Sequence, residues 1–199
     1  MTKFTGWRRG SGIAVVVACL SVTGMTASFG AHPLAKSVSK FKHGSEHWLV
    51  SGDPVSSKPT FFKRGGNPGG YIETTDAAQG GIMYWSAPAK FLGNKGQNYG
   101  GVLHFDLREG ASGRQFDASD VILKGGATRL TYDTATNPGP DWTSYDVPLS
   151  ETGWMKGDLP ATRADMLAVL ASLKVVLIRA EFASHTEVDD LDNVSIKGP

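Results

Sequence analysis

The chain has 199 residues, of which 20 are basic and 19 acidic, so its formal net charge is +1. Three basic residues, Lys3, Arg8 and Arg9, lie near the N-terminus, and without them 17 basic and 19 acidic residues leave a net charge of −2. A chain so close to neutral has no bulk electrostatic attraction for phosphate backbones or anionic lipid, which argues against nucleic acid as a partner.

The N-terminus has the pattern of a secretory signal peptide over residues 1–31. The three basic residues precede an apolar run from Ile13 to Met25, and small residues follow it. The run is shorter than the ~20 residues that a membrane-spanning helix needs. We therefore expect cleavage between Ala27 and Ala31 and no transmembrane segment. The mature protein is then secreted or periplasmic, and its roughly 165 residues suit a single domain.

The only cysteine, Cys19, lies inside the apolar run. The sequence VVAC resembles a lipobox, in which Cys19 would be acylated and would anchor the protein to a membrane. However, Arg9 stands close to Cys19 and the chain stays apolar beyond it, which favours cleavage downstream, with a lipoprotein as the alternative. A mature chain without cysteine has no disulfide, so its stability must come from packing and from any bound ion.

Residues 32–40 lack aromatic side chains and a regular period, and we expect a flexible lead-in there, with the domain itself over residues 41–199. Near the start of the domain, HGSEH (His43–His47) has the H-x-x-E-H spacing of an inverted zinc-protease motif. Such a motif requires a helix. Gly44 and the strand-like sequence from Trp48 favour a loop leading into the first strand, with Trp48 in the core.

Short apolar segments follow one another at intervals of roughly ten residues, the pattern of an all-β sandwich or barrel. Many of the 25 glycines and 10 prolines separate them. Leu103, Phe105 and Leu107 alternate with polar residues, so their strand should bury one face. The expected strands are Trp48–Ser51, Thr60–Lys63, Gly70–Thr74, Ile82–Ser86, Val102–Leu107, Asp120–Lys124, Arg129–Tyr132, Thr143–Leu149, Val175–Phe182 and Asp192–Ile196.

One helix is expected near residues 163–173. Thr162 can cap its N-terminus, with Asp165 at the third position after the cap. Its apolar stripe has helical spacing and should pack across one end of the sandwich. The stripe consists of Met166, Leu167, Val169, Leu170 and Leu173.

Catalytic patterns are weak in this chain. It contains no G-x-S-x-G elbow, and the histidines outside the HGSEH motif are scattered. The acidic run from Glu187 to Asp192 offers paired carboxylates, but Asp190 and Asp192 share one strand face, whereas a glycosidase needs two carboxyls that face each other across a cleft. We therefore do not expect an enzyme, and a secreted hydrolase is kept as an alternative.

Five segments of the chain resemble, in sequence and in order, those of a known domain family. They are YWSAPAKFLGNKGQNYGGVLHFDL (Tyr84–Leu107), DVILKGGATRLTY (Asp120–Tyr132), ETGW with Glu151 and Trp154, TRADMLAVLASLKVVLIRAEF (Thr162–Phe182) and LDNVSI (Leu191–Ile196). Together, and in this order, they resemble the laminin B domain, also called laminin IV type A. The resemblance implies an antiparallel β-sandwich of the jelly-roll, galactose-binding-like kind, found in extracellular matrix proteins.

The resemblance also implies a metal site. In many galactose-binding-like sandwiches the start of the first strand and the end of the last lie side by side and share a structural calcium ion. This nominates Asp192 as a calcium ligand, with Glu46 or Asp53 as its partner and loop carbonyls completing the shell, since calcium prefers such oxygens. The alternative is a solvated acidic turn without metal.

The leader and the resemblance together suggest a noncatalytic binding module for carbohydrate or for a glycoprotein of the matrix or cell surface. Sugar rings are held by aromatic faces and polar side chains. Trp142 in the loop NPGPDW is the first candidate, and Tyr99 and Asn94 lie in a second loop, where Tyr99 can equally be a packing residue. The alternative is a purely structural or assembly domain without a small ligand.

Overall fold

The computed structural model describes residues 1–3, 6, 37–110 and 115–199. The expected signal peptide and its cleavage site, including Cys19, therefore lie almost entirely outside the described residues. In the part of the chain that is described, no helix is long and apolar enough to span a membrane.

Two antiparallel sheets form the domain. The seven-stranded sheet has the order β1-β4-β11-β6-β7-β9-β10, and the five-stranded sheet has the order β2-β3-β12-β5-β8. The strands are β1 Leu49–Ser51, β2 Thr60–Gly66, β3 Gly69–Thr75, β4 Tyr84–Ser86, β5 Val102–Glu109, β6 Val121–Gly125, β7 Thr128–Tyr132, β8 Thr143–Pro148, β9 Trp154–Lys156, β10 Leu159–Pro160, β11 Leu173–Arg179 and β12 Val188–Lys197. The fold is the antiparallel β-sandwich that the sequence predicts.

The core lies between the two sheets and follows the alternation of the strands. Leu103, Phe105 and Leu107 of β5 are 0%, 0% and 3% exposed, which confirms the predicted inward face. Trp48 is buried, as expected, and Trp85 and Trp154 are buried as well, so these three indoles are structural.

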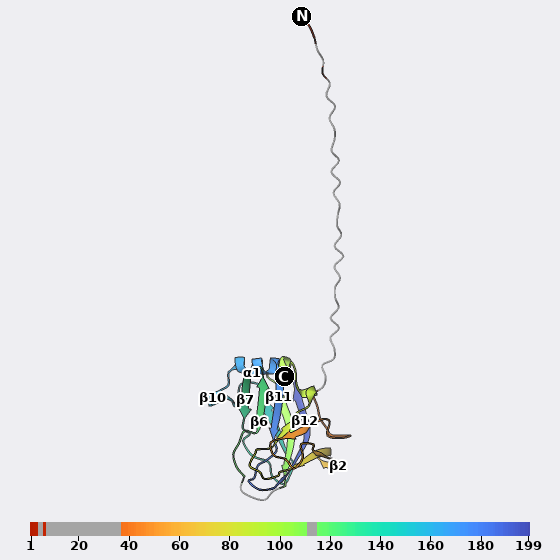
Figure 1. Cartoon of the computed structure of the whole chain (residues 1–199), viewed down its shortest axis with the longest axis vertical. Coiled ribbons are helices and arrows are strands. Elements are labelled where there is room, and N and C mark those ends of the chain that lie inside the picture. The colour runs from red at the N-terminus through yellow and green to blue at the C-terminus, as the bar shows by residue number, and fades with distance from the viewer. Residues whose placement is uncertain (4–5, 7–36, 111–114) are drawn as a thin grey trace. The chain divides into compact units, whose positions relative to one another are not determined.

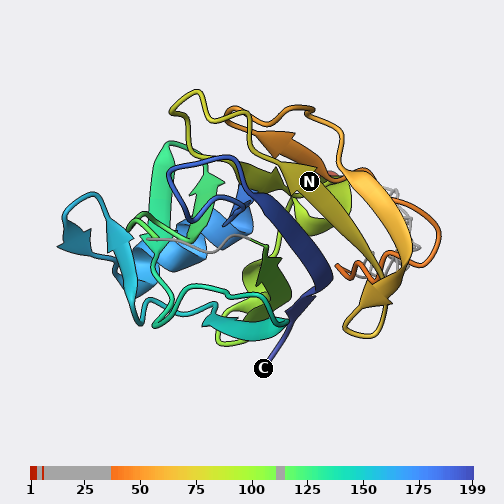
Figure 2. The same cartoon turned by 90° about the horizontal axis from the view of Figure 1, so that it is seen from below.

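All ten predicted strands are present, although several of their ends differ. The largest difference is at β12, which begins at Val188 instead of Asp192 and so includes most of the acidic run. The hairpin of β9 and β10 was not predicted, because strands of three and two residues are too short to show a period. Figure 2 shows this hairpin and the β2–β3 pair at opposite sides of the domain.

The predicted helix is present as α1, Arg163–Ala171. Its capping box is formed, since the Asp165 amide donates to Thr162 Oγ1 at 3.2 Å and the Thr162 amide donates to Asp165 Oδ2 at 3.0 Å. Figure 1 shows α1 lying across the ends of β6, β7 and β11. A Cβ at Gly125 of β6 would lie only 2.4 Å from the Val169 carbonyl oxygen, so glycine is what allows this close approach. Two short 3-10 helices, η1 Ala89–Phe91 and η2 Gly96–Asn98, precede β5.

The domain begins earlier than residue 41. Residues 37–39 run antiparallel to the end of β12, with the Ser39 amide donating to the Val194 carbonyl at 2.7 Å and the Ile196 amide donating to the Ser37 carbonyl at 2.9 Å. These bonds make residues 37–39 part of the sheet, not of a flexible lead-in. Residues 32–36 lie outside the described residues.

The HGSEH segment is a turn and not a helix, as expected. Glu46 and His47 have φ of 50° and 67°, a left-handed conformation that interrupts any regular helix. The Glu46 carboxylate forms an ion pair with Lys90. The segment therefore lacks the helical geometry of the zinc-protease motif.

Candidate functional site

The outer face of the five-stranded sheet carries aromatic and charged side chains. Successive residues of a strand point to opposite faces, so Tyr71 of β3 and Arg108 of β5 project outward where Ile72 and Leu107 enter the core. Each residue of this outer surface is therefore next in sequence to a residue of the core.

Four side chains on this face form what we call the aromatic patch: Phe62, Tyr71, Arg108 and Trp142. The rings of Phe62 and Tyr71 stack with centroids 5.0 Å apart, and the Trp142 ring meets Tyr71 edge-on at 5.7 Å. The Arg108 guanidinium lies 4.8 Å from the Trp142 ring and donates to Asp190 Oδ2 at 2.7 Å. Trp142 is half-buried and Phe62 is 36% exposed, whereas Tyr71 is only 8% exposed, so Trp142 and Phe62 form the exposed part of the patch.

A groove of about 440 Å³ adjoins the aromatic patch on the same face. The two are linked through the end of β2 and the turn that follows it, because Trp142 Nε1 donates to the carbonyl of Gly65 in β2 at 2.9 Å and Asn67 in the turn lines the groove. The side chains and backbone that line it come from the turn, β5, β8, β12 and the segment before β1. They belong to Val38, Lys40, Asn67, Pro68, His104, Asp106, Ser144, Asn193, Ser195 and Lys197.

A pair of carboxylates held by amides lies at the base of the groove, where Asp106 lines it and the buried Asp192 contacts the lining residues Asn67 and Asn193. Asp106 of β5 and Asp192 of β12 are direct cross-strand partners and are 2% and 0% exposed. Asn193 Nδ2 donates to Asp106 Oδ2 at 2.7 Å, and the Asn67 amide donates to Asp192 Oδ2 at 2.7 Å. Asn193 has a φ of 52° at a bulge in β12, and such bulges turn a side chain toward a new direction.

Further polar groups stand beside this pair of carboxylates. The ring of His104 lies between two carboxylates, with Nδ1 2.8 Å from Asp146 Oδ1 and Nε2 3.5 Å from Asp106 Oδ1. Lys40 Nζ lies 3.4 Å from Asn193 Oδ1. The groove therefore offers hydrogen-bond donors as well as acceptors.

Burial leaves some acceptors of this face without donors. Oδ1 of Asp106 and Oδ1 of Asp190 are buried and accept no hydrogen bond from the residues that the structure describes. Burial raises the pKa of Asp190 and of Asp192 to about 6 in each case.

The family model for laminin B (domain IV) matches residues 84–198, which is more than half of the chain. The chain belongs to the laminin B family. The match includes β4 and η1 through β12, and with them the pair of carboxylates at the base of the groove.

Other comparisons agree with this membership. The basement membrane proteoglycan of Caenorhabditis elegans is 33% identical over 109 residues, which are 54% of this chain and 3% of that protein. The L4b domain of human laminin alpha-2 has a TM-score of 0.56 at 20% identity, over 64% of this chain and 80% of that one. A family 11 carbohydrate-binding module of Clostridium thermocellum has a TM-score of 0.53 at 14% identity, over 84% and 97%. At such identities the two structures show the fold alone.

Only one of the three predicted sugar-binding residues lies on the outer face of this laminin B domain. Trp142 is in the aromatic patch. Tyr99 packs against the core and donates from its hydroxyl to Glu151 Oε2 at 2.6 Å, and Asn94 accepts from the Gly96 amide at 2.9 Å. Gly100, next to Tyr99, bonds to Leu149 beyond the far end of β8 from Trp142, so the two loops do not form one site.

The predicted metal ligands do not converge either. Asp192 accepts backbone amides at the base of the groove, and Glu46 is paired with Lys90. Asp53 instead lies beside Asp76 and Glu181, and these three carboxylates offer oxygens within 4.8 Å of one another. A group of this kind can hold a hard cation such as calcium, but not with Asp192 and Glu46 as ligands. Calcium binding stays a prediction, which thermal melting with calcium and with chelator tests.

A second acidic cluster of the laminin B domain faces inward. Asp189 of β12 is the direct cross-strand partner of Glu109 of β5, and Glu187 lies just before β12. All three are at most 3% exposed. Burial, opposed by hydrogen bonds from the Ala183 and Phe182 amides, raises the pKa of Glu187 to about 8, and burial also raises the pKa of Asp189 well above its usual range. Glu187 and Asp189 therefore hold protons at pH values where exposed carboxyls are ionised.

Several residues of the laminin B groove escaped the sequence analysis. His104 and Asp106 alternate with core residues of β5. Polar residues on a binding face and on an ordinary solvent-exposed face show this same alternation, so the sequence does not distinguish the two. The signal that was present is in LDNVSI, where Asn193 interrupts an otherwise regular alternation, as a bulge residue does.

Proposed function

We propose that this laminin B domain is a noncatalytic extracellular module that binds carbohydrate on the outer face of its five-stranded sheet. The observation that carries the proposal is the aromatic patch beside a polar groove. Aromatic ring faces pack on the apolar faces of sugar rings, and a few fixed polar groups orient them. The carbohydrate-binding module of similar fold and the matrix proteoglycan relative support a glycan or a matrix glycoprotein as the partner class.

A glycan array with the purified protein tests this proposal. Trp142→Ala and Phe62→Ser each remove a ring from the patch and should weaken binding about tenfold, equivalent to about 1.4 kcal/mol. Leu159→Ser is the matched control, since Leu159 is 71% exposed on β10 of the other sheet. Melting temperatures of all variants check that the fold is retained.

The competing function is a structural or assembly module without a small ligand. An array without any bound glycan, for a protein that melts cooperatively, would favour that alternative. Binding that survives the loss of both rings would place the site elsewhere on the domain.

A further inference from the structure

The binding face consists of two parts that follow each other along β5. Arg108, beneath Trp142, belongs to the aromatic patch, and the next outward residues, Asp106 and His104, line the groove. From Arg108 to Val102 the strand extends about 20 Å, at about 3.4 Å per residue. The patch and the groove together are therefore longer than one sugar ring.

The two parts are held in a fixed relation by the β2–β3 turn. The carbonyl of Gly65, near the end of β2, accepts the hydrogen bond of Trp142. The backbone amide of Asn67 in the turn donates to Asp192, the cross-strand partner of the groove residue Asp106. Ser144, two residues after Trp142, also lines the groove. A ligand can therefore contact both parts at once without any rearrangement of the strands.

The chemistry of the two parts differs. The patch offers ring faces, whereas the groove offers carboxylate, amide, imidazole and ammonium groups that bond to hydroxyls. A single sugar can occupy only one of the two parts. Successive units of an unbranched chain can occupy both parts, because such a chain is long enough to extend along the strand from the patch into the groove.

Resting on the proposed function, we infer that the ligand is an unbranched oligosaccharide of several units, laid along β5 and β12 from Trp142 into the groove. We assign to Asn193 the role of positioning the part of the ligand that lies in the groove. The side-chain amide of Asn193 donates to Asp106 Oδ2 at 2.7 Å and to the Asn67 carbonyl, and so it fixes the positions of two residues that line the groove.

Calorimetric titration with chito-, gluco- and manno-oligosaccharides of one to six units tests this inference. For at least one series the Kd should fall by about tenfold or more as units are added, and then stay constant once the face is filled. Asn193→Gly keeps the left-handed backbone, since glycine adopts positive φ without strain, and it removes only the amide. This variant should lose the gain with length while short oligosaccharides bind as before. Asn94→Gly, in the remote loop, is the matched control.

The outcomes separate this inference from the proposed function. If a glycan binds on the array but affinity does not rise with length in any series, the inference is overturned and the function stands. A length dependence that Asn193→Gly leaves unchanged would remove Asn193 from the site. If no array glycan and no oligosaccharide binds, the proposed function itself is contradicted.

Discussion

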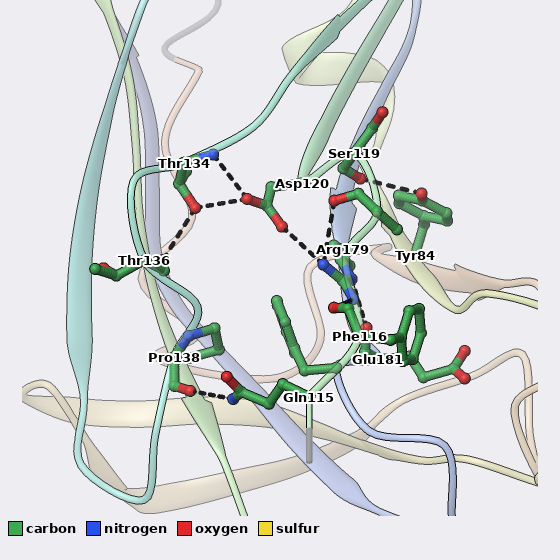
Figure 3. A network of polar contacts seen from close by, with 12 residues as sticks. Tyr84, Gln115, Phe116, Ser119, Asp120, Thr134, Thr136, Pro138, Arg179 and Glu181 are labelled. Carbon is green, nitrogen blue, oxygen red and sulfur yellow. Dashed lines mark hydrogen bonds and ion pairs between the residues drawn. The ribbon is translucent and has the colours of Figure 1, made fainter.

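Arg179 and Asp120 form a buried ion pair, with 3.3 Å between Nη1 and Oδ1, and the two residues are only 0% and 4% exposed. The same guanidinium donates to the carbonyls of Phe116, Ala118 and Glu181 (Figure 3). All three nitrogens of the planar guanidinium thereby donate, which is the geometry that favours arginine over lysine. The network fastens the segment before β6 onto β11.

We expect Arg179→Met to destabilise the domain by about 3–5 kcal/mol, because it leaves a buried carboxylate and several carbonyls without their donor. Urea unfolding measures the loss. Arg129→Met, at an exposed position of β7, is the matched control and should change the stability by less than about 0.5 kcal/mol. Equal effects of the two substitutions would contradict the described network.

The alternation of β5 predicts unequal costs for two neighbouring residues. Phe105 is buried and stacks on Tyr145 with centroids 5.3 Å apart, so Phe105→Ala should cost about 3–5 kcal/mol. His104 lies on the outer face with 22% of its side chain exposed, and His104→Ala should cost less than about 1 kcal/mol. Chemical denaturation of both variants checks the prediction, and similar losses would mean that β5 is not oriented as described.

Stability should fall as the pH rises from about 5.5 to 8. The folded state raises the pKa of Glu187 to about 8 and of Asp192 to about 6, so it holds protons that the unfolded chain has released. Stability from a raised carboxyl pKa is complete below the unfolded pKa and is lost through the folded one. The free energy of unfolding should fall by about 4 kcal/mol over this range, of which Glu187 supplies about 3 kcal/mol.

Glu187→Gln is the variant that isolates this effect. Its amide oxygen can still accept from the backbone while the group no longer titrates, so the pH slope above pH 6 should flatten. A wild-type stability that rises toward pH 8 would exclude protonated acids in the interior.

The processing of the N-terminus is a separate prediction. Mass spectrometry of the secreted protein should find an N-terminus between Ser28 and Lys36. Cleavage beyond Ser37 would remove the hydrogen bonds of this residue to Ile196 and Lys95. A diacylated peptide that begins at Cys19 would show that the protein is a lipoprotein.

The sequence predicts most of the fold because its signals are local. Thr162 and Asp165 mark the start of α1, and Leu103 to Leu107 show the alternation of a half-buried strand. The predicted strand begins at Asp192 and so leaves out Asp189 and Asp190. The sequence therefore does not show which acidic residues of β12 face inward and which face outward.

The candidate site was harder to predict because it is assembled from distant segments. Trp142 was selected for its place in a turn, but nothing local indicates that it meets Tyr71 of β3 and Arg108 of β5. Tyr99 has the same residue type and a similar glycine-rich setting, and it packs against the core instead. Only the pairing of strands decides which aromatic residue faces a groove.

The pairing of Val38 with Ser195 brings the two ends of the domain together. Because these two segments are antiparallel, the chain enters the domain and leaves it at nearly the same point. A domain whose two ends are adjacent can be inserted into a surface loop of another domain. Such an insertion leaves the distance between the two halves of that loop almost unchanged.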